Sequence, residues 1–340
     1  MKMIPVENAV GMVLVHDMTE IIPGKYKGAA FKKGHIIKKE DIPHLLDMGK
    51  EHIFVLENRD GEIHEDEAAG RIARAAAGQG IGLTEPNEGK VNLLAKCKGL
   101  LKVNEGALFE INSMEGIVLS TLHSNRLVDV NTVVAGAKII PLTIGEKKII
   151  SMEKICSENN PVIQVMPLLK LKAGLVTTGN ELYYKRIPDK SGPVFVEKFR
   201  ELGSEVIKQI FSKDDPNMIA ESIKALIKAG ADIVLVTGGM SVDPDDVTPT
   251  GVKKAGAQIL SYGAPTMPGA MFLLSYIKNI PVLGLPACVM YNKRTIFDLV
   301  IPRLAAGERI ERRDVIRFAH GGLCLGCKDC RYPNCGFGNG

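Results

Sequence analysis

The sequence predicts an α/β fold with a mainly parallel sheet and helices on both faces, preceded by a β-rich α+β region and followed by a short Cys-rich tail. Three observations lead to this prediction. From residue 171 onward, short apolar runs alternate with amphipathic helical patterns, as in strands joined by helices. Between residues 90 and 164, apolar runs recur that Gly and Asn separate. Four of the seven cysteines lie after residue 320.

Composition sets the limits of this fold. A chain of 340 residues, 45% of them hydrophobic, can bury sizeable cores in two or three domains. The net charge of +4 is small and dispersed, which argues against nucleic-acid binding. No apolar run reaches the roughly 18 residues of a membrane span, and polar residues interrupt residues 1–17, where a signal peptide would be apolar. We therefore expect a cytoplasmic protein without membrane attachment.

The first half of the chain divides into two segments. Residues 1–60 form a small α+β module, with a Lys- and Gly-rich loop at 24–34, a short helix over 42–48 that Asp41 can cap, and a strand at 53–56. Residues 61–168 form a mostly β region that opens with a helix over 64–77, whose acidic start favours its amino end. Its strands are expected at 99–103, 107–111, 117–121, 127–134, 138–142 and 162–166, with one short helix at 151–156.

The α/β domain is expected over residues 169–310 and the Cys-rich, metal-binding tail over 311–340. The helix at 216–229 has the clearest local signals, because Asp215 precedes it, Pro216 occupies its first turn and Gly230 follows it. The other helices are predicted at 191–202, 248–255 and 289–305. Strands are predicted at 173–177, 205–211, 232–236, 257–261, 271–277 and 281–285.

The most informative stretch is residues 237–249, which follow a buried strand. They therefore lie at the carboxyl end of that strand, where open α/β sheets bind ligands. Gly238 and Gly239 let the backbone approach an anion, and nearby hydroxyl and carboxylate side chains offer polar contacts. Loops 177–182 and 263–270, with residues 285–288, should meet this stretch at the same edge.

These four loops resemble the molybdopterin-binding domain that is shared by the molybdopterin molybdotransferases and the molybdopterin adenylyltransferases. The resemblance rests on Thr-Thr-Gly-Asn-Glu-Leu at 177–182, the 237–249 stretch, Met-Pro-Gly at 267–269 and Gly-Leu-Pro at 284–286. It covers roughly residues 171–304. It implies that Thr178, Gly179 and Glu181 line one wall, and that the loop around Gly238 holds the pterin phosphate.

The resemblance also implies roles for individual residues. Glu181 and Asp246 become the candidate catalytic residues, with Asp246 serving Mg²⁺ or molybdate. The candidate cofactor-binding residues are Thr178, Gly179, Asn180, Thr237, Gly238, Gly239, Ser241, Asp245, Thr248, Pro268, Gly269 and Pro286. Simpler interpretations stand beside these: Asp246 as the N-cap of the helix at 248, Glu181 as a helix-start charge, and the two glycines as a tight turn.

The departures from the family pattern leave several functions open. Lysines surround the Pro-Gly pair in molybdotransferases, whereas this chain has Met267, Ala270 and Met271, and losing charge-assisted bonds weakens oxyanion capture. One hypothesis is a molybdotransferase that binds adenylated molybdopterin and molybdate and releases AMP. The alternative is a non-catalytic carrier or sensor of the pterin or molybdenum cofactor, and a third is adenylyl transfer. The resemblance implies a homo-oligomer, with a molybdoenzyme or another cofactor-synthesis protein as partner.

The tail cysteines, Cys324, Cys327, Cys330 and Cys335, have the spacing C-x2-C-x2-C-x4-C. Four thiolates satisfy either an iron–sulfur cluster or a tetrahedral Zn²⁺ site. The competing interpretation is a disordered tail with free thiols. Cys97, Cys156 and Cys288 are scattered, which is typical of small buried side chains.

Overall fold

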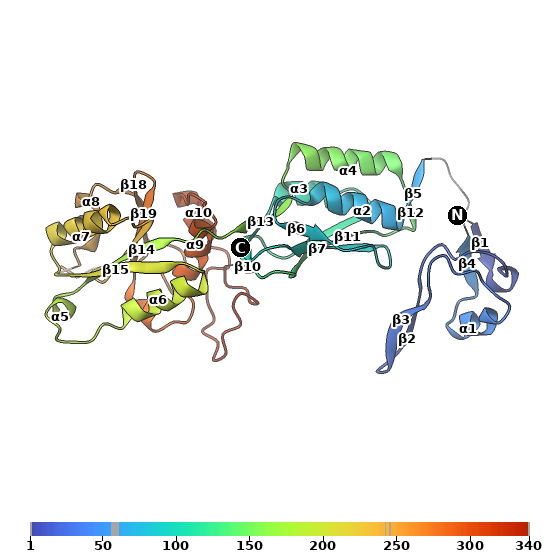
Figure 1. The fold of residues 1–340 in the computed structure, drawn as a ribbon, viewed down its shortest axis with the longest axis horizontal. Coiled ribbons are helices and arrows are strands. Elements are labelled where there is room, and N and C mark those ends of the chain that lie inside the picture. Colours follow the sequence, from blue (N-terminus) through green and yellow to red (C-terminus); the bar gives the residue numbers. More distant parts are fainter. Residues whose placement is uncertain (1, 56–60, 242, 245, 339–340) are drawn as a thin grey trace. The chain divides into compact units, whose positions relative to one another are not determined.

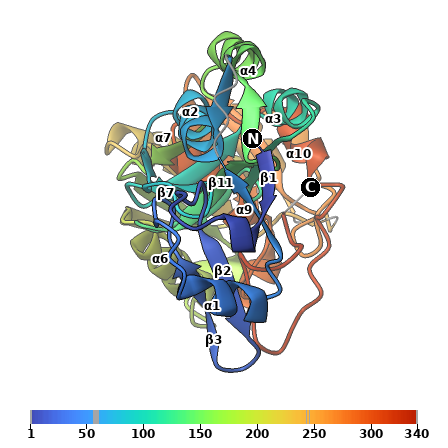
Figure 2. The same cartoon turned by 90° about the vertical axis from the view of Figure 1, so that its right-hand side faces the viewer.

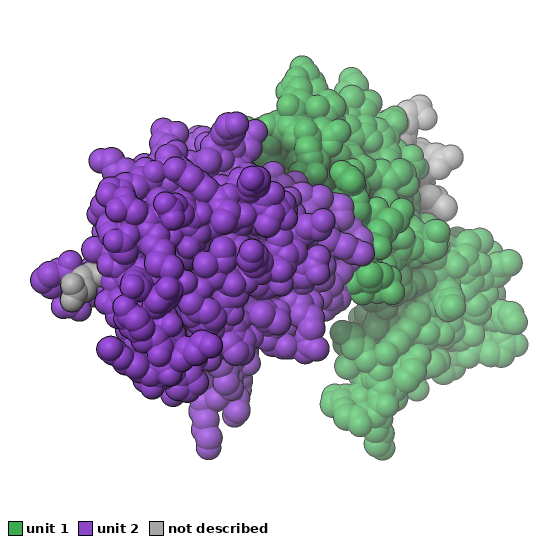
Figure 3. All heavy atoms as spheres, turned by 60° about the vertical axis from the view of Figure 1, so that its left-hand side comes forward, with its two compact units in different colours: residues 1–96, 103–122, 130–164 green, residues 97–102, 123–129, 165–340 purple. Residues whose placement is uncertain are grey.

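The computed structural model describes residues 2–55, 61–241, 243–244 and 246–338. The chain divides into two compact units, coloured separately in Figure 3. Unit 1 comprises residues 1–96, 103–122 and 130–164, and unit 2 comprises residues 97–102, 123–129 and 165–340. Within the described residues, no helix is both long and apolar enough to span a membrane.

Unit 1 begins with a small module built on two strand pairs. β1 (Lys2–Pro5) pairs antiparallel with β4 (His52–Val55), and β2 (Met18–Ile22) forms a hairpin with β3 (Tyr26–Phe31). η1 (Val6–Asn8) and α1 (Asp41–Asp47) complete it. The predicted loop at 24–34 is therefore mostly strand β3. Asp41 does not cap α1; it is the first helical residue, and its carboxylate instead accepts bonds from Lys38 N–H and the His35 ring. The last residue of the predicted strand 53–56 lies outside the described residues.

The rest of unit 1 is a four-stranded antiparallel sheet with helices on one side. The sheet order is β6 (Ile81–Leu83), β7 (Lys90–Ala95), β11 (Val133–Ile139) and β9 (Ile117–Thr121). α2 (Glu65–Ala76), α3 (Glu105–Asn112) and α4 (Glu146–Glu158) lie on the same side of it (Figure 2). β5 (Glu62–His64) pairs with β12 (Thr143–Gly145). Arg71 of α2 bridges to Glu153 of α4 at 2.7 Å, which ties two of the helices together.

Three predictions for this region are wrong. Residues 107–111 form helix α3 rather than a strand, because the Asn104 side chain caps the Ala107 N–H and starts a helix there. The helix expected at 151–156 is the longer α4. The strands expected at 127–134 and 138–142 are β10 (Arg126–Val128) and β11, which a turn with Asn131 at φ 66° separates. β10 instead joins β8 (Gly99–Val103) and β13 (Ile163–Pro167) in a three-stranded sheet.

Unit 2 confirms the predicted α/β architecture. Its six-stranded sheet has the order β15 (Glu205–Ser212), β14 (Lys172–Thr178), β16 (Ile233–Thr237), β19 (Ile280–Leu285), β18 (Leu273–Ile277) and β17 (Gln258–Tyr262). Figure 1 labels β14, β15, β18 and β19 of this sheet. The first four strands are parallel, and β18 and β17 extend the sheet antiparallel. The sheet is therefore mainly parallel.

Hydrophobic cores cover both faces of this sheet. α6 (Ser191–Glu201) and α9 (Ile296–Ala305) pack on one face, where Phe195 and Phe297 are in ring contact at 5.2 Å. α7 (Pro216–Lys228) and α8 (Thr248–Lys254) pack on the other. Along β16, Ile233 and Leu235 join the first core, while the alternate residues 234 and 236 join the second, as the period of a strand requires. This is why the strand is apolar throughout.

The last part of unit 2 differs from the prediction. The helix expected over 289–305 is the 3-10 turn η2 (Ala287–Met290) followed by α9, which begins where Thr295 and Asp298 form a capping box. The segment after α9 carries a further helix, α10 (Arg312–Arg317). Beyond it, Leu323 pairs with Met267 in an isolated β-bridge, and Phe337 is buried in the α6–α9 core. The tail therefore folds onto unit 2, and a disordered tail is excluded for its described residues.

Candidate functional site

The four predicted loops lie at one edge of the unit 2 sheet. In the parallel ladders, Thr177 pairs with Thr237, and Thr237 pairs with Leu285, so three strands end side by side. On the antiparallel strand β18, Leu273 pairs with Gly284, which brings the preceding loop 263–272 to the same edge. The chain that follows each parallel strand therefore shares this edge with the β17–β18 loop.

Gly238 and Gly239 form the turn after β16 and have positive φ angles of 87° and 56°. A Cβ on Gly238 would lie 2.5 Å from the Thr178 carbonyl oxygen. A Cβ on Gly239 would lie 2.9 Å from Thr248 Oγ1. Glycine suits both positions, because the backbone conformation is left-handed at each and a side chain would meet strand β14 at Gly238 and the start of α8 at Gly239.

Buried threonine hydroxyls hold this turn in place. Thr248 Oγ1 donates to the Gly238 carbonyl oxygen at 2.8 Å, and Thr178 Oγ1 donates to the Thr237 carbonyl oxygen at 3.1 Å. Both side chains are almost fully buried. Thr248 and Thr178 were predicted to bind a ligand. Their hydroxyls instead form hydrogen bonds inside the protein, and these bonds fix the shape of the glycine turn. Ser241, by contrast, is exposed just after that turn.

The Asp246 carboxylate lies in a turn of its own. Its Oδ2 accepts the Asp243 N–H at 3.0 Å, and the backbone N–H of Asp246 donates to the Asp243 carbonyl at 2.9 Å. Asp246 does not cap α8, because Val247 takes the N-cap position without a side-chain bond. The simpler interpretation of Asp246 is therefore wrong, and its carboxylate is half-buried beside the glycine turn. Asp245 lies outside the described residues.

Tyr262 is a neighbour of this turn that sequence reasoning missed. Its phenol donates to the Met240 carbonyl at 2.9 Å, so it braces the loop after Gly239 from the end of β17. Burial and then the negative charge of Asp246 raise the pKa of Tyr262, which keeps the phenol protonated as a donor. Tyr262 lies 22 residues from the carbonyl that it binds, and no local pattern marks such a pair.

The loop after β14 presents Asn180 and Glu181 on short helix α5 (Asn180–Tyr183). Gly179 is buried with φ 137°, and the Glu181 carboxylate folds back to within 2.9 Å of where a Cβ of Gly179 would lie. The Asn180 N–H donates to Asp214 at 2.9 Å. The Glu181 side chain is exposed in the first turn of α5, a position that suits both a ligand contact and a helix-start charge.

Asp189 is the centre of a polar network at this edge that the sequence did not reveal. It accepts from Gln209 Nε2 at 2.7 Å and from the Ser191 N–H and hydroxyl at 2.9 Å each. Gln209 also donates to Thr177 Oγ1 at 2.8 Å. Burial opposes ionisation, but these hydrogen bonds, that of Gln209 foremost, outweigh it and lower the pKa of Asp189. An Asp two residues before a Ser at a helix start was the available signal.

A cavity of about 490 Å³ lies beside this network. Its polar lining includes Lys185, Arg186 and Asp189, and Tyr183 contributes an aromatic wall. Lys213 lies over the rings of Tyr183 and Tyr184 at 5.2 and 5.1 Å. The cations at this part of the edge therefore lie after β14 (Lys185 and Arg186) and after β15 (Lys213), and not in the loop at 263–270, where molybdotransferases have lysines.

Pro268, Gly269 and Pro286 complete the edge. Gly269 is buried with φ 126°, and a Cβ there would lie 2.6 Å from Ile296 at the start of α9. Pro286 follows β19 directly and is the N-cap residue of η2. Met267 is exposed, and its backbone is held by the tail: its N–H donates to the Gly322 carbonyl and its carbonyl accepts the Cys324 N–H, both at 2.8 Å.

Among the described residues, none of the seven cysteines is joined in a disulfide. Cys156 is buried as expected, and burial raises its pKa to about 11, whereas Cys97 and Cys288 are only partly buried. All four tail cysteines line one cavity of about 420 Å³. Within the described residues, no three His, Cys, Asp or Glu side chains converge as a metal site. The sulfurs thus share a cavity without being gathered around one point.

These features place the four predicted loops of the α/β domain at the carboxyl end of its parallel strands. Residues 174–306 match the family model described as a probable molybdopterin binding domain. Residues 3–57 match a second model, described as a domain of unknown function (DUF8806).

Individual relatives resemble only parts of the chain. A CinA-like protein of Mycobacterium sp. (strain MCS) is 31% identical over 80 residues, or 24% of this chain and 19% of that protein. The chain thus spans about a fifth of the length of the curated relatives that it matches. The match to the tungsten cofactor synthesizing protein MoaB from Pyrococcus furiosus covers 40% of this chain and 91% of that protein, with 23% identity and a TM-score of 0.33. The match to the molybdopterin biosynthesis moea protein from Pyrococcus horikosii covers 90% of this chain and 74% of that protein, with 15% identity and a TM-score of 0.34.

Proposed function

We propose that this protein acts in molybdenum cofactor biosynthesis and binds molybdopterin at the carboxyl edge of the unit 2 sheet. The observation that carries the proposal is the family match over residues 174–306, together with the side-chain-free turn at Gly238 and Gly239. The pterin phosphate would lie on this turn. The two glycines leave its backbone open to an anion, and the buried Thr248 hydroxyl keeps the turn in that shape.

Asp246 and Glu181 would serve the metal and reacting groups at this site. Mg²⁺ keeps several waters and is bound through one or two carboxylates plus substrate phosphates, so a protein cage of three side chains is not needed. Asp246 fits that requirement, because it is half-buried next to the glycine turn with one oxygen taken by a single backbone N–H. The ion would supply charge neutralisation of the phosphate. Asp246 would hold it, and Glu181 would face it from the first loop.

The specific activity proposed is that of a molybdotransferase, in which adenylated molybdopterin takes up molybdate and AMP is released, in a homo-oligomer. The test is a turnover assay with purified protein, adenylated molybdopterin, molybdate and Mg²⁺, with AMP as the product measured. Asp246→Asn should abolish AMP release while leaving the fold intact by circular dichroism. Glu7→Gln, an exposed substitution in unit 1, should match the wild type. No AMP above a no-protein blank would defeat the catalytic proposal.

A second candidate is a pterin or cofactor carrier or sensor without turnover. It is favoured by the loop at Met267, which lacks the lysines and whose backbone is bonded to the Cys-rich tail on both sides. The measurement that separates the two is calorimetry of molybdopterin binding alongside the AMP assay. Binding without AMP release selects the carrier, and the absence of both rejects both candidates.

A further inference from the structure

The tail cysteines lie around one cavity that the proposed pterin site does not use. Besides the four sulfurs, its lining includes Arg294, Tyr332 and Phe337. Cys324 and Cys335 are partly buried, while Cys327 and Cys330 are exposed between them. Four cysteine sulfurs lining one cavity provide the ligand number of a metal or iron–sulfur centre.

The ends of this cysteine segment are anchored and its middle is irregular. Cys324 is fixed by its N–H bond to the Met267 carbonyl, and Phe337, two residues after Cys335, is buried in the α6–α9 core. Residues 324–331 form neither helix nor strand. Cys327 and Cys330 can therefore move toward the anchored pair without breaking regular structure.

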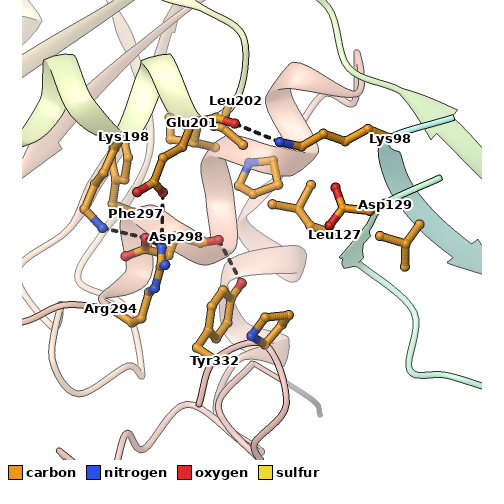
Figure 4. Close-up of a pocket in the computed structure, with 14 residues that line it drawn as sticks. Lys98, Leu127, Asp129, Lys198, Glu201, Leu202, Arg294, Phe297, Asp298 and Tyr332 are labelled. Atoms are coloured by element: carbon orange, nitrogen blue, oxygen red, sulfur yellow. Dashed lines mark hydrogen bonds and ion pairs between the residues drawn. The ribbon is translucent and has the colours of Figure 1, made fainter. Parts of the chain in front are cut away.

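A cation forms one wall of the cavity. The Arg294 guanidinium makes a side-chain hydrogen bond with Cys330. It also lies over the Tyr332 ring at 5.2 Å and donates to Asp298 at 2.9 Å, and Figure 4 labels these three residues. Its Nε is buried without a hydrogen-bond partner among the described residues. A buried donor left unpaired costs roughly 1–3 kcal/mol, which favours an acceptor at this wall.

Further contacts of Asp298 hold Arg294 in position. Asp298 also pairs with Lys198 at 2.5 Å, and the Tyr332 hydroxyl donates to the Asp298 carbonyl at 3.1 Å, so both wall residues are tied to α9 (Figure 4). Such outer contacts orient and tune the groups that surround a metal centre.

We propose that the tail cysteines bind an iron–sulfur cluster of the [4Fe–4S] type in this cavity. Three features favour a cluster over a single Zn²⁺. The cavity of about 420 Å³ is larger than one tetrahedral ion with Zn–S bonds of about 2.3 Å requires. Three cysteines follow one another at two-residue intervals, as in ferredoxin runs, rather than as two separated pairs. Arg294 in the wall supplies a side-chain hydrogen bond to Cys330, and hydrogen bonds to the sulfurs tune cluster potentials.

The experiment is anaerobic purification of the full chain, with iron, acid-labile sulfide and zinc measured per chain. We expect about four iron and four sulfide, with visible absorption that bleaches on reduction with dithionite. Cys327→Ser and Cys330→Ser should each lose at least half of the iron in the folded fraction. Cys97→Ser, a partly buried thiol outside the tail, should retain the wild-type content. None of these readouts requires pterin binding, so the outcome is independent of the proposed function.

Two results would overturn the proposal. One zinc per chain without sulfide replaces the cluster by a zinc site. Absence of iron after reconstitution with ferrous iron and sulfide, or equal iron in Cys327→Ser and wild type, removes the site altogether. Arg294→Lys tests the wall separately: it should keep the iron but lower the midpoint potential of the cluster, since an N–H bond to sulfur stabilises the reduced state. An unchanged potential would remove Arg294 from the wall.

Discussion

The Thr248 hydroxyl donates a hydrogen bond of 2.8 Å to the carbonyl oxygen of Gly238, ten residues earlier in the chain. The backbone N–H of Thr248 also donates to the Gly239 carbonyl at 3.2 Å. One residue at the start of α8 therefore holds both carbonyls of the glycine turn. The glycine turn and the first turn of this helix are consequently held together as one structural unit.

Thr248→Val should break this unit without changing its volume much. The buried Gly238 carbonyl would lose its donor, so we expect the free energy of unfolding to fall by about 1–3 kcal/mol and pterin affinity to fall with it. Urea unfolding and calorimetry check the two effects. The matched control is Thr250→Val on the exposed side of α8, where both quantities should stay unchanged. Equal losses in the two variants would contradict the role given to Thr248.

Gly238→Ala and Gly256→Ala form a second matched pair. Both glycines have positive φ, at 87° and 95°, so both variants carry the backbone cost of about 1–2 kcal/mol. A Cβ at Gly256 meets nothing within 4 Å, whereas one at Gly238 lies 2.5 Å from the Thr178 carbonyl oxygen. Gly238→Ala should therefore cost about 1–3 kcal/mol more in urea unfolding and abolish pterin binding. Similar losses of unfolding free energy in both variants would show that the turn at Gly238 can accommodate a Cβ.

Local signals explain what the sequence could predict of the fold. Asp215, Pro216 and Gly230 mark both ends of α7 within a few residues, and the side chain of Asp215 does cap its N–H groups at 2.8 Å. Where signals compete, the prediction was wrong. The apolar run at 107–111 suits a strand, but the cap at Asn104 makes it a helix.

The candidate site likewise contains features that local sequence predicts and features that it does not. The Gly238–Gly239 turn is a local feature, and it could be predicted from its place after an apolar strand. The network around Asp189 depends on Gln209, twenty residues away on the neighbouring strand, and on the sheet register that brings them together. The pairing of Met267 with Leu323 joins two distant loops. Contacts of this kind follow from tertiary packing, which periodicity alone does not specify.

Asp298→Asn should destabilise unit 2 strongly. Asp298 is 6% exposed, pairs with Lys198 and Arg294, and completes the capping box of α9. Its loss leaves the buried Lys198 ammonium without a counter-charge, which costs about 3–5 kcal/mol. Glu197→Gln, which removes the exposed pair with Arg200, should cost less than about 1 kcal/mol. Chemical denaturation measures the free energy of unfolding of both variants. A small loss of stability in Asp298→Asn would show that the Lys198 ammonium is solvated by water.

Acid should act on stability through Asp189. Because its folded-state pKa is lowered, the folded protein binds fewer protons than the unfolded chain near that pKa. The stabilisation is therefore fully present above about pH 4, the ordinary pKa range of Asp, and is lost as the pH falls through the lowered value. The stability gap between wild type and Asp189→Asn should narrow in that window. Urea unfolding between pH 6 and 3 measures this gap. If the free energies of unfolding of the two proteins differ by the same amount at every pH, the role given to Asp189 is contradicted.

Phe337→Ala tests whether the tail is an integral part of unit 2. Phe337 is 4% exposed and contacts the Tyr332 ring with centroids 6.2 Å apart, so truncation should cost about 3–5 kcal/mol. Leu325→Ala, at a residue 85% exposed in the same tail, should cost less than about 0.5 kcal/mol. Thermal unfolding of the iron-free chain provides the comparison, because bound metal would add its own stabilisation. If the two variants unfold alike, the tail is not anchored at Phe337, and the cysteine cavity loses the wall on which the cluster proposal depends.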